Sequence, residues 1–311
     1  MKILITGIYG FVGSNFARMA INLEHEVVGF SRLSNMKNKS RINSIVENPN
    51  FTMIYGDITN PNDTSDLCER IDAVVNCVSK SGTNSKSLID TNIIGTFNLL
   101  ESACKYNTKF IQVNTDQVYG DPKTSHEEPY DELQALNPYN ECTATKAAAE
   151  MLCLSYYNLY GLPIIITRAE NNYGPYQQQN ENIPQWTKDA LKNVNIKTFE
   201  TVTQPWLHIQ DHCYAIFHLI KKGIPGEIYN IAGNERYKDI DIINQIIKIT
   251  QSKSKIHILS DVCNIVSTIK PEYSINSEKL RILGWKTKYS IDTDLKKVVE
   301  WYKLNEWWWF K

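Results

Sequence analysis

The chain has 311 residues, of which 42% are hydrophobic and 22% are charged, and its formal net charge is −1. This length can bury one large core, or a main domain plus a smaller one. The near-neutral charge, without a long basic run, argues against a nucleic-acid-binding protein. No segment approaches the roughly 18 apolar residues of a membrane span, and the apolar start MKILITG is too short for a signal peptide. Seven scattered cysteines predict reduced thiols in the cytoplasm, and no Cys or His spacing predicts a metal site.

In the first half of the chain, short apolar runs alternate with segments of helical periodicity. Strands are expected at 2–6, 26–30, 51–57, 73–78, 110–115 and 163–168, and helices at 11–23, 63–70, 87–106 and 142–160. The strands are β-branched and nearly continuously apolar, which is typical of parallel strands buried on both faces. This alternation predicts an α/β fold with a doubly wound parallel sheet, which binds ligands at the carboxyl ends of its strands.

The second half has a more mixed pattern. Helices are expected at 182–193, 211–222, 239–251 and 292–303, and short strands at 196–199, 206–209 and 228–231. We expect residues 1–170 to form the main domain, with the segment 206–232 returning to it. Residues 171–311 are expected to form a smaller, mixed α/β lobe that is interwoven with this domain. The terminal EWWWF is interpreted as a cluster for packing or subunit contact.

A glycine-rich turn, ITGIYGFVGSNF, joins the first expected strand to the first expected helix. Gly7, Gly10 and Gly13 permit a tight turn and the close approach of a pyrophosphate, which binds the free N–H groups at the start of the helix. Three glycines can also serve a packed turn, but their place between a strand and an amphipathic helix favours dinucleotide binding. Phe11 and Val12, which begin the helix, are counted with the cofactor-binding residues.

The second expected strand ends in Ser31 and Arg32, where an acidic residue would bind a free ribose 2′-hydroxyl. A serine hydroxyl and a guanidinium suit a 2′-phosphate instead, and further basic residues follow between 37 and 41. A solvated basic loop is the alternative interpretation. We therefore predict NADP as the cofactor, with NAD less favoured. Asp57 and Ile58, at the end of the third strand, are expected to lie beside the adenine.

These features resemble the extended short-chain dehydrogenases/reductases, and among them the nucleotide-sugar 4,6-dehydratases and their epimerase relatives. The resemblance is carried by motifs over nearly the whole chain: TGIYGFVGSNF, TNIIGTFNLLE (91–101), NTDQVYGD (114–121), TKAAAE (145–150), RAENNYGPYQ (168–177), WLHIQDH (206–212), GEIYNIAG (226–233) and KLRILGW (279–285). It implies a Rossmann-type NAD(P)-binding domain and a smaller lobe that binds a nucleoside-diphosphate sugar, here expected to be a UDP- or dTDP-linked hexose or N-acetylhexosamine. It also implies a homodimer whose four-helix bundle uses the helices near 92–106 and 145–160.

The resemblance further implies a chemistry and a set of site residues. These enzymes oxidise the sugar at C4 and store the hydride on the cofactor, and the dehydratases then eliminate water across C5 and C6 before the hydride returns to C6. By resemblance, Thr115 binds O4, Asp116 protonates the departing C6 oxygen, and Asn171 contacts the sugar diphosphate region. Lys146 holds the nicotinamide ribose and lowers the pKa of a tyrosine four residues before it, which takes the proton of the C4 hydroxyl.

One departure from the dehydratase pattern concerns the base that removes the C5 proton. Gln117 stands where the dehydratases have a glutamate, and an amide has no proton-accepting state near neutral pH. Gln117 can therefore only orient the substrate. Glu170 stands where small residues are usual and could substitute as a base, although an ordinary ion pair with a basic neighbour is the favoured interpretation.

The second departure concerns the tyrosine. An ungapped alignment places Cys142 in its position, four residues before Lys146, which puts both side chains on one helix face. Alternatively, Tyr139 is the displaced tyrosine, and it reaches the site only if the segment before Cys142 is a loop, which the proline before it permits. We favour Cys142 and expect the nearby ammonium and helix N-terminus to lower its pKa, so that it acts as a thiolate base. A small buried cysteine is the ordinary alternative.

The residues expected to bind the substrate also differ from the dehydratase pattern. Gln204 replaces a phosphate-binding arginine, and Lys270 lies in a stretch that resembles the end of sugar 4-ketoreductases. We predict an NADP-dependent, dehydratase-like enzyme that acts on a nucleoside-diphosphate hexose with Cys142 as an atypical base. The first alternative is a 4-keto-sugar reductase or epimerase, which needs no C5 base. The second is a cofactor-binding, non-catalytic partner subunit, which two altered catalytic positions would explain.

Overall fold

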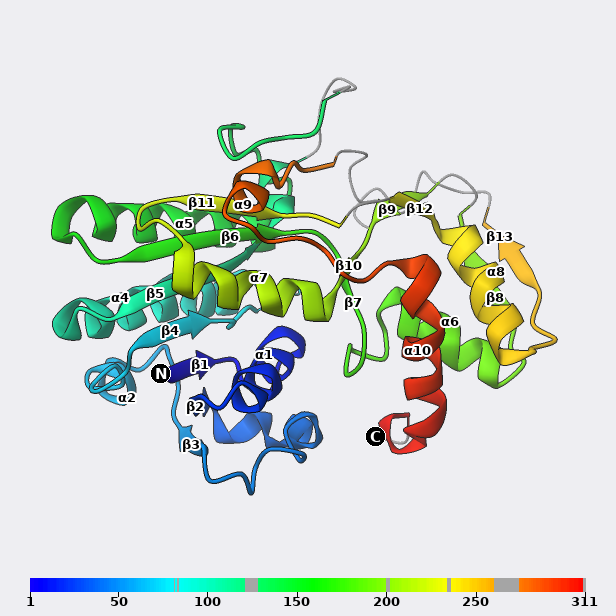
Figure 1. The fold of residues 1–311 in the computed structure, drawn as a ribbon, viewed down its shortest axis with the longest axis horizontal. Helices are drawn as coiled ribbons and strands as arrows, with labels where there is room; N and C mark the ends of the chain where they lie inside the picture. The colour runs from blue at the N-terminus through cyan, green and yellow to red at the C-terminus, as the bar shows by residue number, and fades with distance from the viewer. Residues whose placement is uncertain are drawn as a thin grey trace.

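The computed structural model describes residues 1–80, 82, 84–120, 128–199, 202–233, 236–259 and 274–309, apart from the side chain of Lys37. A larger sheet domain and a smaller helical lobe lie side by side (Figure 1). Among the described residues, no helix has the length and apolar character needed to cross a membrane.

A parallel sheet of seven strands forms the centre of the larger domain. Its strands are β1 (Lys2–Thr6), β2 (Glu26–Ser31), β3 (Phe51–Tyr55), β4 (Ala73–Asn76), β5 (Lys109–Thr115), β6 (Ile164–Ala169) and β11 (Ile228–Ile231). They lie in the order β11-β6-β5-β4-β1-β2-β3, and all neighbouring pairs are parallel. The direction of winding reverses at β1, which opens a crevice at the carboxyl edge of the sheet. The predicted fold class, a doubly wound parallel sheet, is confirmed.

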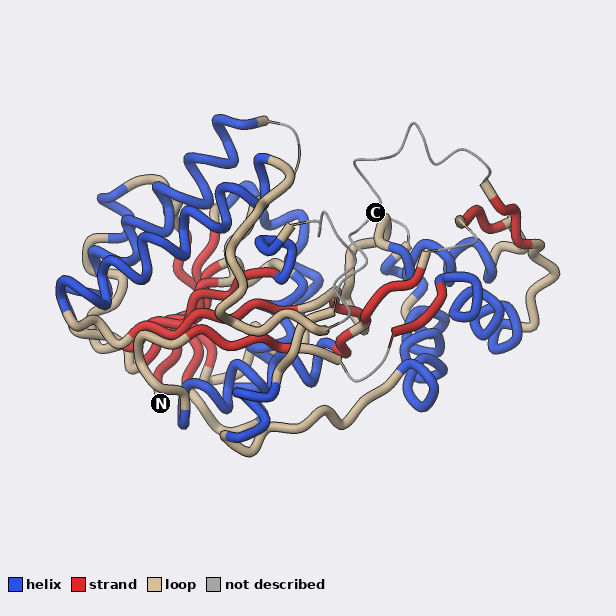
Figure 2. Tube along the Cα trace, turned by 90° about the horizontal axis from the view of Figure 1, so that it is seen from above, coloured by secondary structure: helices blue, strands red, loops and turns tan. Residues whose placement is uncertain are grey.

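Helices cover both faces of this sheet (Figure 2). One face packs against α1 (Phe11–Asn22) and α7 (Ile209–Lys222), and the other against α2 (Pro61–Thr64), α4 (Gly95–Tyr106) and α5 (Glu141–Tyr160). In β1, Ile3 and Ile5 belong to one hydrophobic core and Leu4 belongs to the other. Because successive side chains enter two buried cores, the strands read as continuous apolar runs.

The predicted helix over 87–106 has three consecutive geometries. It consists of α3 (Ser85–Leu88), a π-helical turn, η2 (Ile89–Ile94), and α4. Gly95 begins α4, and a Cβ there would lie 2.4 Å from Cδ1 of Ile58. This glycine therefore allows the helix to approach the loop that follows β3.

The prediction of a helix over 63–70 is wrong in extent. α2 begins at Pro61, because Asn60 caps it by accepting a hydrogen bond from the N–H of Asn62, and it ends at Thr64. The N–H of Cys68 donates to Oγ of Ser102 in α4 at 3.1 Å, so the residues after α2 are bound to α4 rather than to a helix of their own.

The smaller lobe is built on α6 (Asn182–Leu191), α8 (Asp239–Thr250) and α10 (Ile291–Leu304). Three two-stranded sheets accompany them: β7 (Asn172–Tyr173) with β10 (Leu207–His208), β9 (Thr203–Pro205) with β12 (Arg236–Lys238), and β8 (Ile196–Thr198) with β13 (Ile256–Ile258). β8 and β10 fall within the strands expected at 196–199 and 206–209, whereas β7, β9, β12 and β13 have no counterpart among the expected strands. Strands of two or three residues carry too little of a period-2 pattern for the sequence to specify each of them. The shorter elements η1 (Leu33–Arg41), η3 (Asp116–Tyr119), α9 (Glu278–Ile282) and η4 (Glu306–Trp308) complete the described structure.

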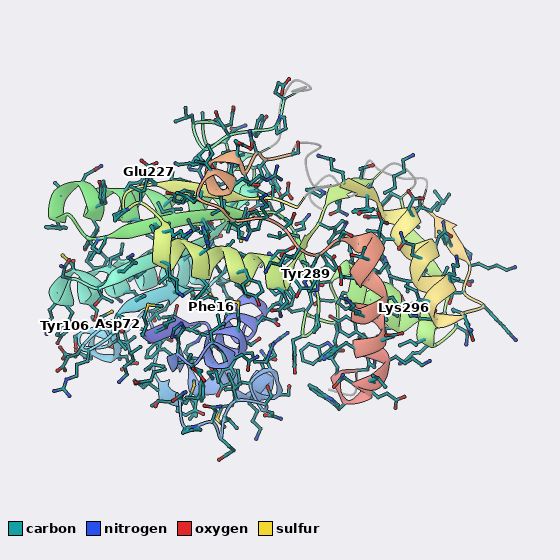
Figure 3. The ribbon with its side chains drawn as sticks, viewed as in Figure 1. Phe16, Asp72, Tyr106, Glu227, Tyr289 and Lys296 are labelled. Atoms are coloured by element: carbon teal, nitrogen blue, oxygen red, sulfur yellow. The ribbon has the colours of Figure 1, made fainter. Side chains whose placement is uncertain are left out.

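The sheet domain and the lobe meet around Tyr289 (Figure 3). The ring of Tyr289 stacks on His208 with 4.4 Å between centroids. The buried carboxylate of Asp211, in the first turn of α7, accepts hydrogen bonds from the backbone N–H groups of Lys288 and Tyr289. These contacts fix the start of α10 relative to the sheet.

Candidate active site

A cavity of about 530 Å³ lies at the carboxyl edge of the sheet, in the crevice beside β1. Its size is typical of ligand-binding clefts. Most of the lining residues follow the ends of four neighbouring strands: they include Gly7 and Gly10 after β1, Ser31 and Arg32 at the end of β2, 56–58 after β3, and 77–80 after β4. The predicted cofactor residues Asp57 and Ile58 are among them.

The glycine-rich turn forms the floor of this first cavity. Gly7 has a φ of +66°, and a Cβ there would lie 2.9 Å from the carbonyl oxygen of Cys77. Gly10 caps α1 without a side-chain hydrogen bond, and no acidic residue occupies the first turn, so the N–H groups and the helix dipole favour an anionic ligand. Gly13 does not line this cavity. A Cβ at Gly13 would lie 2.5 Å from the Gly7 oxygen, so this glycine permits the helix to pack closely against the turn.

The polar end of the first cavity is formed by the residues after β2. Oγ of Ser31 accepts a hydrogen bond from Asn35 at 3.1 Å. The Arg32 guanidinium lies 3.7 Å from the Asp57 carboxylate, and both side chains are partly exposed. Among the described residues, Asp57 is the one acidic residue that lines this cavity.

Arg41, which ends the predicted basic run, reaches the cavity. Its side chain is buried and donates hydrogen bonds to the carbonyl oxygens of Tyr176 and Tyr9, at 3.0 and 3.2 Å. Burial lowers its pKa to about 10, so the guanidinium remains charged at neutral pH. Lys39 is exposed and does not line the cavity.

The end of the chain also reaches this cavity, which the sequence did not indicate for EWWWF. Trp308 lines it, donates its indole N–H to the carbonyl oxygen of Gln177 at 3.1 Å, and lies with its ring centroid 4.9 Å from the Arg41 guanidinium. Tyr176 packs against both Trp308 and Trp301, with ring centroids 6.0 and 4.5 Å apart. Trp308 therefore joins the lobe to the wall of the first cavity.

A second cavity of about 420 Å³ adjoins the first, since Gly10, Cys77 and Ser79 line both. Phe11 and Val12 line this second cavity, as do Asn171 and Gln204.

The two predicted substrate residues are joined by hydrogen bonds. Nδ2 of Asn171 donates to Oε1 of Gln204 at 3.3 Å, and Nε2 of Gln204 donates to both carboxylate oxygens of Asp239 at 3.0 Å. The structure thus brings Asn171 and Gln204 together and fixes the orientation of the Gln204 amide. Lys270 lies outside the described residues.

Helix α5 carries Cys142 and Lys146 one helical turn apart. The helix begins after Asn140, whose side chain accepts a hydrogen bond from the N–H of Thr143 at 2.9 Å in a capping box. Tyr139 precedes this cap, outside the helix, and its side chain is 40% exposed.

Lys146 is buried against the end of β5. Its ammonium donates to the carbonyl oxygen of Val113 at 2.9 Å, and its own carbonyl oxygen accepts from the Asn114 side chain at 3.2 Å. Burial lowers the pKa of Lys146. Two residues beyond Val113, Oγ1 of Thr115 donates to Asp116 at 3.2 Å and accepts from the N–H of Gln117 at 3.3 Å. The structure therefore gathers the predicted catalytic residues at the junction of β5 and α5, although they line neither cavity.

The expectation that Cys142 has a lowered pKa is wrong. Burial raises its pKa, and this effect outweighs the favourable charge of Lys146. The sulfur lies 3.5 Å from the carbonyl oxygen of Lys80, to which the thiol donates a hydrogen bond, and Lys80 lines the first cavity. Cys142 is therefore a protonated thiol at neutral pH.

Asn92 is a site residue that the sequence analysis missed. It accepts a hydrogen bond from the N–H of Lys80 at 2.8 Å and donates to the Lys80 carbonyl oxygen and to Thr145 Oγ1, at 3.2 and 2.9 Å. It thereby fixes the loop after β4 relative to α5. Its only sequence signal is its place in the quoted motif TNIIGT.

The favoured interpretation of Glu170 as a member of an ordinary ion pair is wrong. Glu170 takes part in none of the salt bridges found among the described residues. One carboxylate oxygen instead accepts a hydrogen bond from the N–H of Gly233 at 2.7 Å.

Comparison with known proteins agrees with this geometry. The model of the NAD dependent epimerase/dehydratase family matches residues 3–232. The dTDP-glucose 4,6-dehydratase of Salmonella typhimurium is 32% identical over 99% of this chain and 94% of its own length. A low-salt glycan biosynthesis protein of Haloferax volcanii is 29% identical over 97% of this chain and 98% of its own.

Solved structures give the same result. The dTDP-glucose 4,6-dehydratase of Bacillus anthracis in complex with NAD has a TM-score of 0.88 and 33% identity, and covers 100% of this chain and 99% of its own. The UDP-glucuronic acid 4-epimerase of Bacillus cereus in complex with UDP-glucuronic acid and NAD has a TM-score of 0.86 and 27% identity, and covers 98% of this chain and 99% of its own.

Proposed function

The chain belongs to the NAD dependent epimerase/dehydratase family, as its motifs predicted, and from this premise we propose that it is an NADP-dependent enzyme that dehydrates a nucleoside-diphosphate hexose. The proposal is supported above all by two adjoining cavities. One is lined by the glycine turn and the other by Asn171 and Gln204, and the Thr115–Lys146 cluster lies beside them. The hexose class follows from the relatives, several of which are named dTDP-glucose 4,6-dehydratases.

The first cavity fits a dinucleotide with a 2′-phosphate. The open N-terminus of α1 suits a pyrophosphate, and Ser31, Arg32 and Arg41 supply a hydroxyl and two cations to the same cavity. Asp57, the one acidic lining residue in the part of the chain that the structure describes, already faces Arg32. The two solved relatives described above contain NAD, so NAD is the competing outcome for this chain. When bound, the dinucleotide supplies the hydride acceptor and, in its oxidised form, an additional positive charge.

In this proposal the residues around Lys146 bind the sugar and transfer the protons. Thr115 binds O4 of the sugar, and Cys142 takes the proton of the C4 hydroxyl. Because the resting thiol is protonated, this role requires the positive charge of the oxidised cofactor, added to that of Lys146, to lower the pKa of Cys142 when the site is filled. Asp116 exchanges protons with the C5–C6 region, and the Gln117 amide orients the sugar.

A second candidate function is reduction or epimerisation of a 4-keto sugar. It is favoured by one observation, the amide of Gln117 where a carboxylate base would be needed for elimination. The two functions differ in their products, because elimination removes one water from the sugar whereas reduction consumes the reduced cofactor.

We also propose that the enzyme is a cytoplasmic homodimer. Large apolar side chains are exposed along α4, α5 and the preceding turn: Ile94, Phe97, Met151, Tyr157, Leu159 and Tyr160. A four-helix bundle between two copies would cover these side chains. Light scattering of the wild type and of Tyr160→Glu tests the dimer, which the substitution should dissociate.

The function is tested by incubating the purified chain with UDP- and dTDP-glucose and with the corresponding N-acetylglucosamine nucleotides. Loss of one water in the mass spectrum of the sugar, with no net consumption of cofactor, is the expected result. Consumption of NADPH with a 4-keto sugar would favour the second candidate. No turnover, together with co-purification of a second subunit, would favour a non-catalytic partner. Release of the bound dinucleotide by denaturation, followed by chromatography, distinguishes NADP from NAD.

A further inference from the structure

Two buried carboxyl groups are brought together at the carboxyl edge of the sheet. Strands β5 and β6 are parallel neighbours, and their register places Thr115 opposite Ala169. The next residue of each strand is acidic, Asp116 in one and Glu170 in the other, and these residues are 6% and 4% exposed. Adjacent parallel strands lie about 4.8 Å apart, so Asp116 and Glu170 leave the sheet from neighbouring positions, and the charge of Asp116 acts on Glu170.

Glu170 is held rigidly in this position. Its N–H donates to the carbonyl oxygen of Ile231 at 3.1 Å, and its carboxylate accepts from the N–H of Gly233 at 2.7 Å. A Cβ added to Gly233 would lie 2.3 Å from the Trp206 carbonyl oxygen and 3.6 Å from Oε2 of Glu170. Since Trp206 and Asn171 line the second cavity, the Glu170 carboxyl lies directly behind the wall of that cavity.

The environment of Glu170 favours its protonated form. Burial is the main cause and the charge of Asp116 is the next, and together they raise the pKa of Glu170 to about 8. The N–H groups of Gly233 and Ile275 and the more distant Arg236 act in the opposite direction without cancelling this effect. Two neighbouring carboxyls in a buried site do not readily ionise together, and such a pair therefore shares one proton.

We propose that Glu170 is the proton-holding partner of Asp116, and that this pair replaces the carboxylate base that Gln117 cannot provide. Glu170 acts through Asp116 and is a positioning residue rather than a group that touches the sugar. The inference rests on the proposed function, because it assigns the proton path of the elimination.

The proton path balances without any additional reactant. Asp116, kept ionised because Glu170 holds the shared proton, takes the proton from C5 and delivers it to the C6 oxygen as the C6–O bond breaks and water leaves. With the hydride supplied by the bound dinucleotide, C5 would receive the proton of Glu170 by way of Asp116. Cys142 would then return the proton that it took from the C4 hydroxyl to the pair, which restores the thiolate and the pair to their starting states.

The decisive variant is Glu170→Gln, whose side-chain oxygen can still accept the hydrogen bond from Gly233. The wild type should lose kcat as the pH rises through about 8, because Glu170 then loses its proton. In Glu170→Gln we expect this alkaline limb to disappear and kcat to fall by roughly 100-fold, with little change in KM. The matched control is Glu132→Gln, because Glu132 also accepts a hydrogen bond from a backbone N–H, that of Asn230 at 2.8 Å, and has no place in the proton path.

A measurement that does not depend on turnover completes the test. In protein labelled with ¹³C-glutamate, the side-chain carboxyl signal assigned by its loss in Glu170→Gln should titrate near pH 8, and Asp116→Asn should lower its midpoint. The pairing would be overturned, with the proposed function intact, by either of two results. One is an unchanged pH profile and kcat in Glu170→Gln, and the other is a titration midpoint of the Glu170 carboxyl that does not change in Asp116→Asn. A chain that turns over no nucleotide sugar but shows the coupled titration would overturn the proposed function and the proton path, leaving a carboxyl pair without this role.

Discussion

The guanidinium of Arg41 lies 4.9 Å from the centroid of the Trp308 ring, and this contact joins the glycine-turn domain to the last turn of the chain. Arg41 ends η1, which follows β2, whereas Trp308 follows α10 of the lobe. Both residues line the first cavity. The lobe that is expected to bind the sugar therefore also forms part of the proposed dinucleotide site, so ligands in the two cavities can influence each other through this contact.

Substitution of Trp308 tests whether its contact with Arg41 contributes to dinucleotide binding in the first cavity. Trp308→Ala removes the cation–π contact and the hydrogen bond to Gln177, and we expect it to weaken dinucleotide binding by roughly 3- to 30-fold. The measurement is titration calorimetry with NADP and with NADPH. Trp307→Ala is the matched control, because Trp307 belongs to the same terminal turn, is 42% exposed and does not line the cavity. Equal effects of the two substitutions would show that the terminal turn acts only through general packing.

The residues at the end of β2 are expected to decide cofactor preference. Arg32→Ala should weaken NADP binding by roughly 10- to 100-fold, as expected for the loss of a charge-assisted hydrogen bond, and should change NAD binding much less. Ser31→Asp should move preference toward NAD. Comparison of the two dissociation constants in each variant measures the effect, with exposed Lys39→Ala as the control. A wild type that prefers NAD would contradict the NADP assignment directly.

Cys142 is expected to be needed for turnover and not for cofactor binding. Cys142→Ala should lower kcat by roughly 100-fold or more through loss of the proton acceptor, with unchanged dinucleotide affinity. Cys142→Tyr, which supplies the phenol expected at this position, should retain more activity than Cys142→Ala. Cys104→Ala, on α4, serves as the control. Full turnover in Cys142→Ala, together with its loss in Tyr139→Phe, would assign the role to Tyr139 instead.

Glu170 also predicts how stability depends on pH. Its pKa is raised in the folded chain to about 8, so between its unfolded and folded pKa values the folded state binds more protons than the unfolded state. The contribution of Glu170 to the free energy of unfolding is therefore fully present below its unfolded pKa and is lost as the pH rises through about 8. Thermal melting at pH 5.5 and 8.5 should show a smaller decrease in Tm for Glu170→Gln than for the wild type.

The buried pair of Arg168 and Glu150 is expected to be essential for stability. Nε of Arg168 lies 2.8 Å from the Glu150 carboxylate, and the two side chains are 3% and 0% exposed. Glu150→Ala leaves an unpaired buried guanidinium and should cost about 3–5 kcal/mol, measured by urea unfolding. The control is Glu300→Ala, which removes the solvent-exposed partner of Lys296 (Figure 3) and should cost no more than about 1 kcal/mol. A similar loss in both variants would contradict the importance of burial.

The sequence alone determined the parallel sheet, the position of the glycine turn and the family. Local sequence patterns specify these features. The sheet, for example, is indicated by continuous apolar runs between helices, which are typical of parallel strands buried on both faces. The cluster of Thr115, Asp116, Cys142 and Lys146 could also be predicted, since a motif and a helical spacing of four residues specify it. Similarly, the absence of an acidic residue at Ser31 can be read directly from the end of one strand.

The surroundings of these residues depend on the folded chain. The charge state of Cys142 depends on how far burial outweighs a nearby ammonium, and burial is a property of the whole fold. Glu170 becomes the neighbour of Asp116 through the register of β5 and β6, and Trp308 reaches Arg41 only because α10 returns to the sheet domain. The last two relationships join residues that are far apart in the chain, so no local pattern could have specified them.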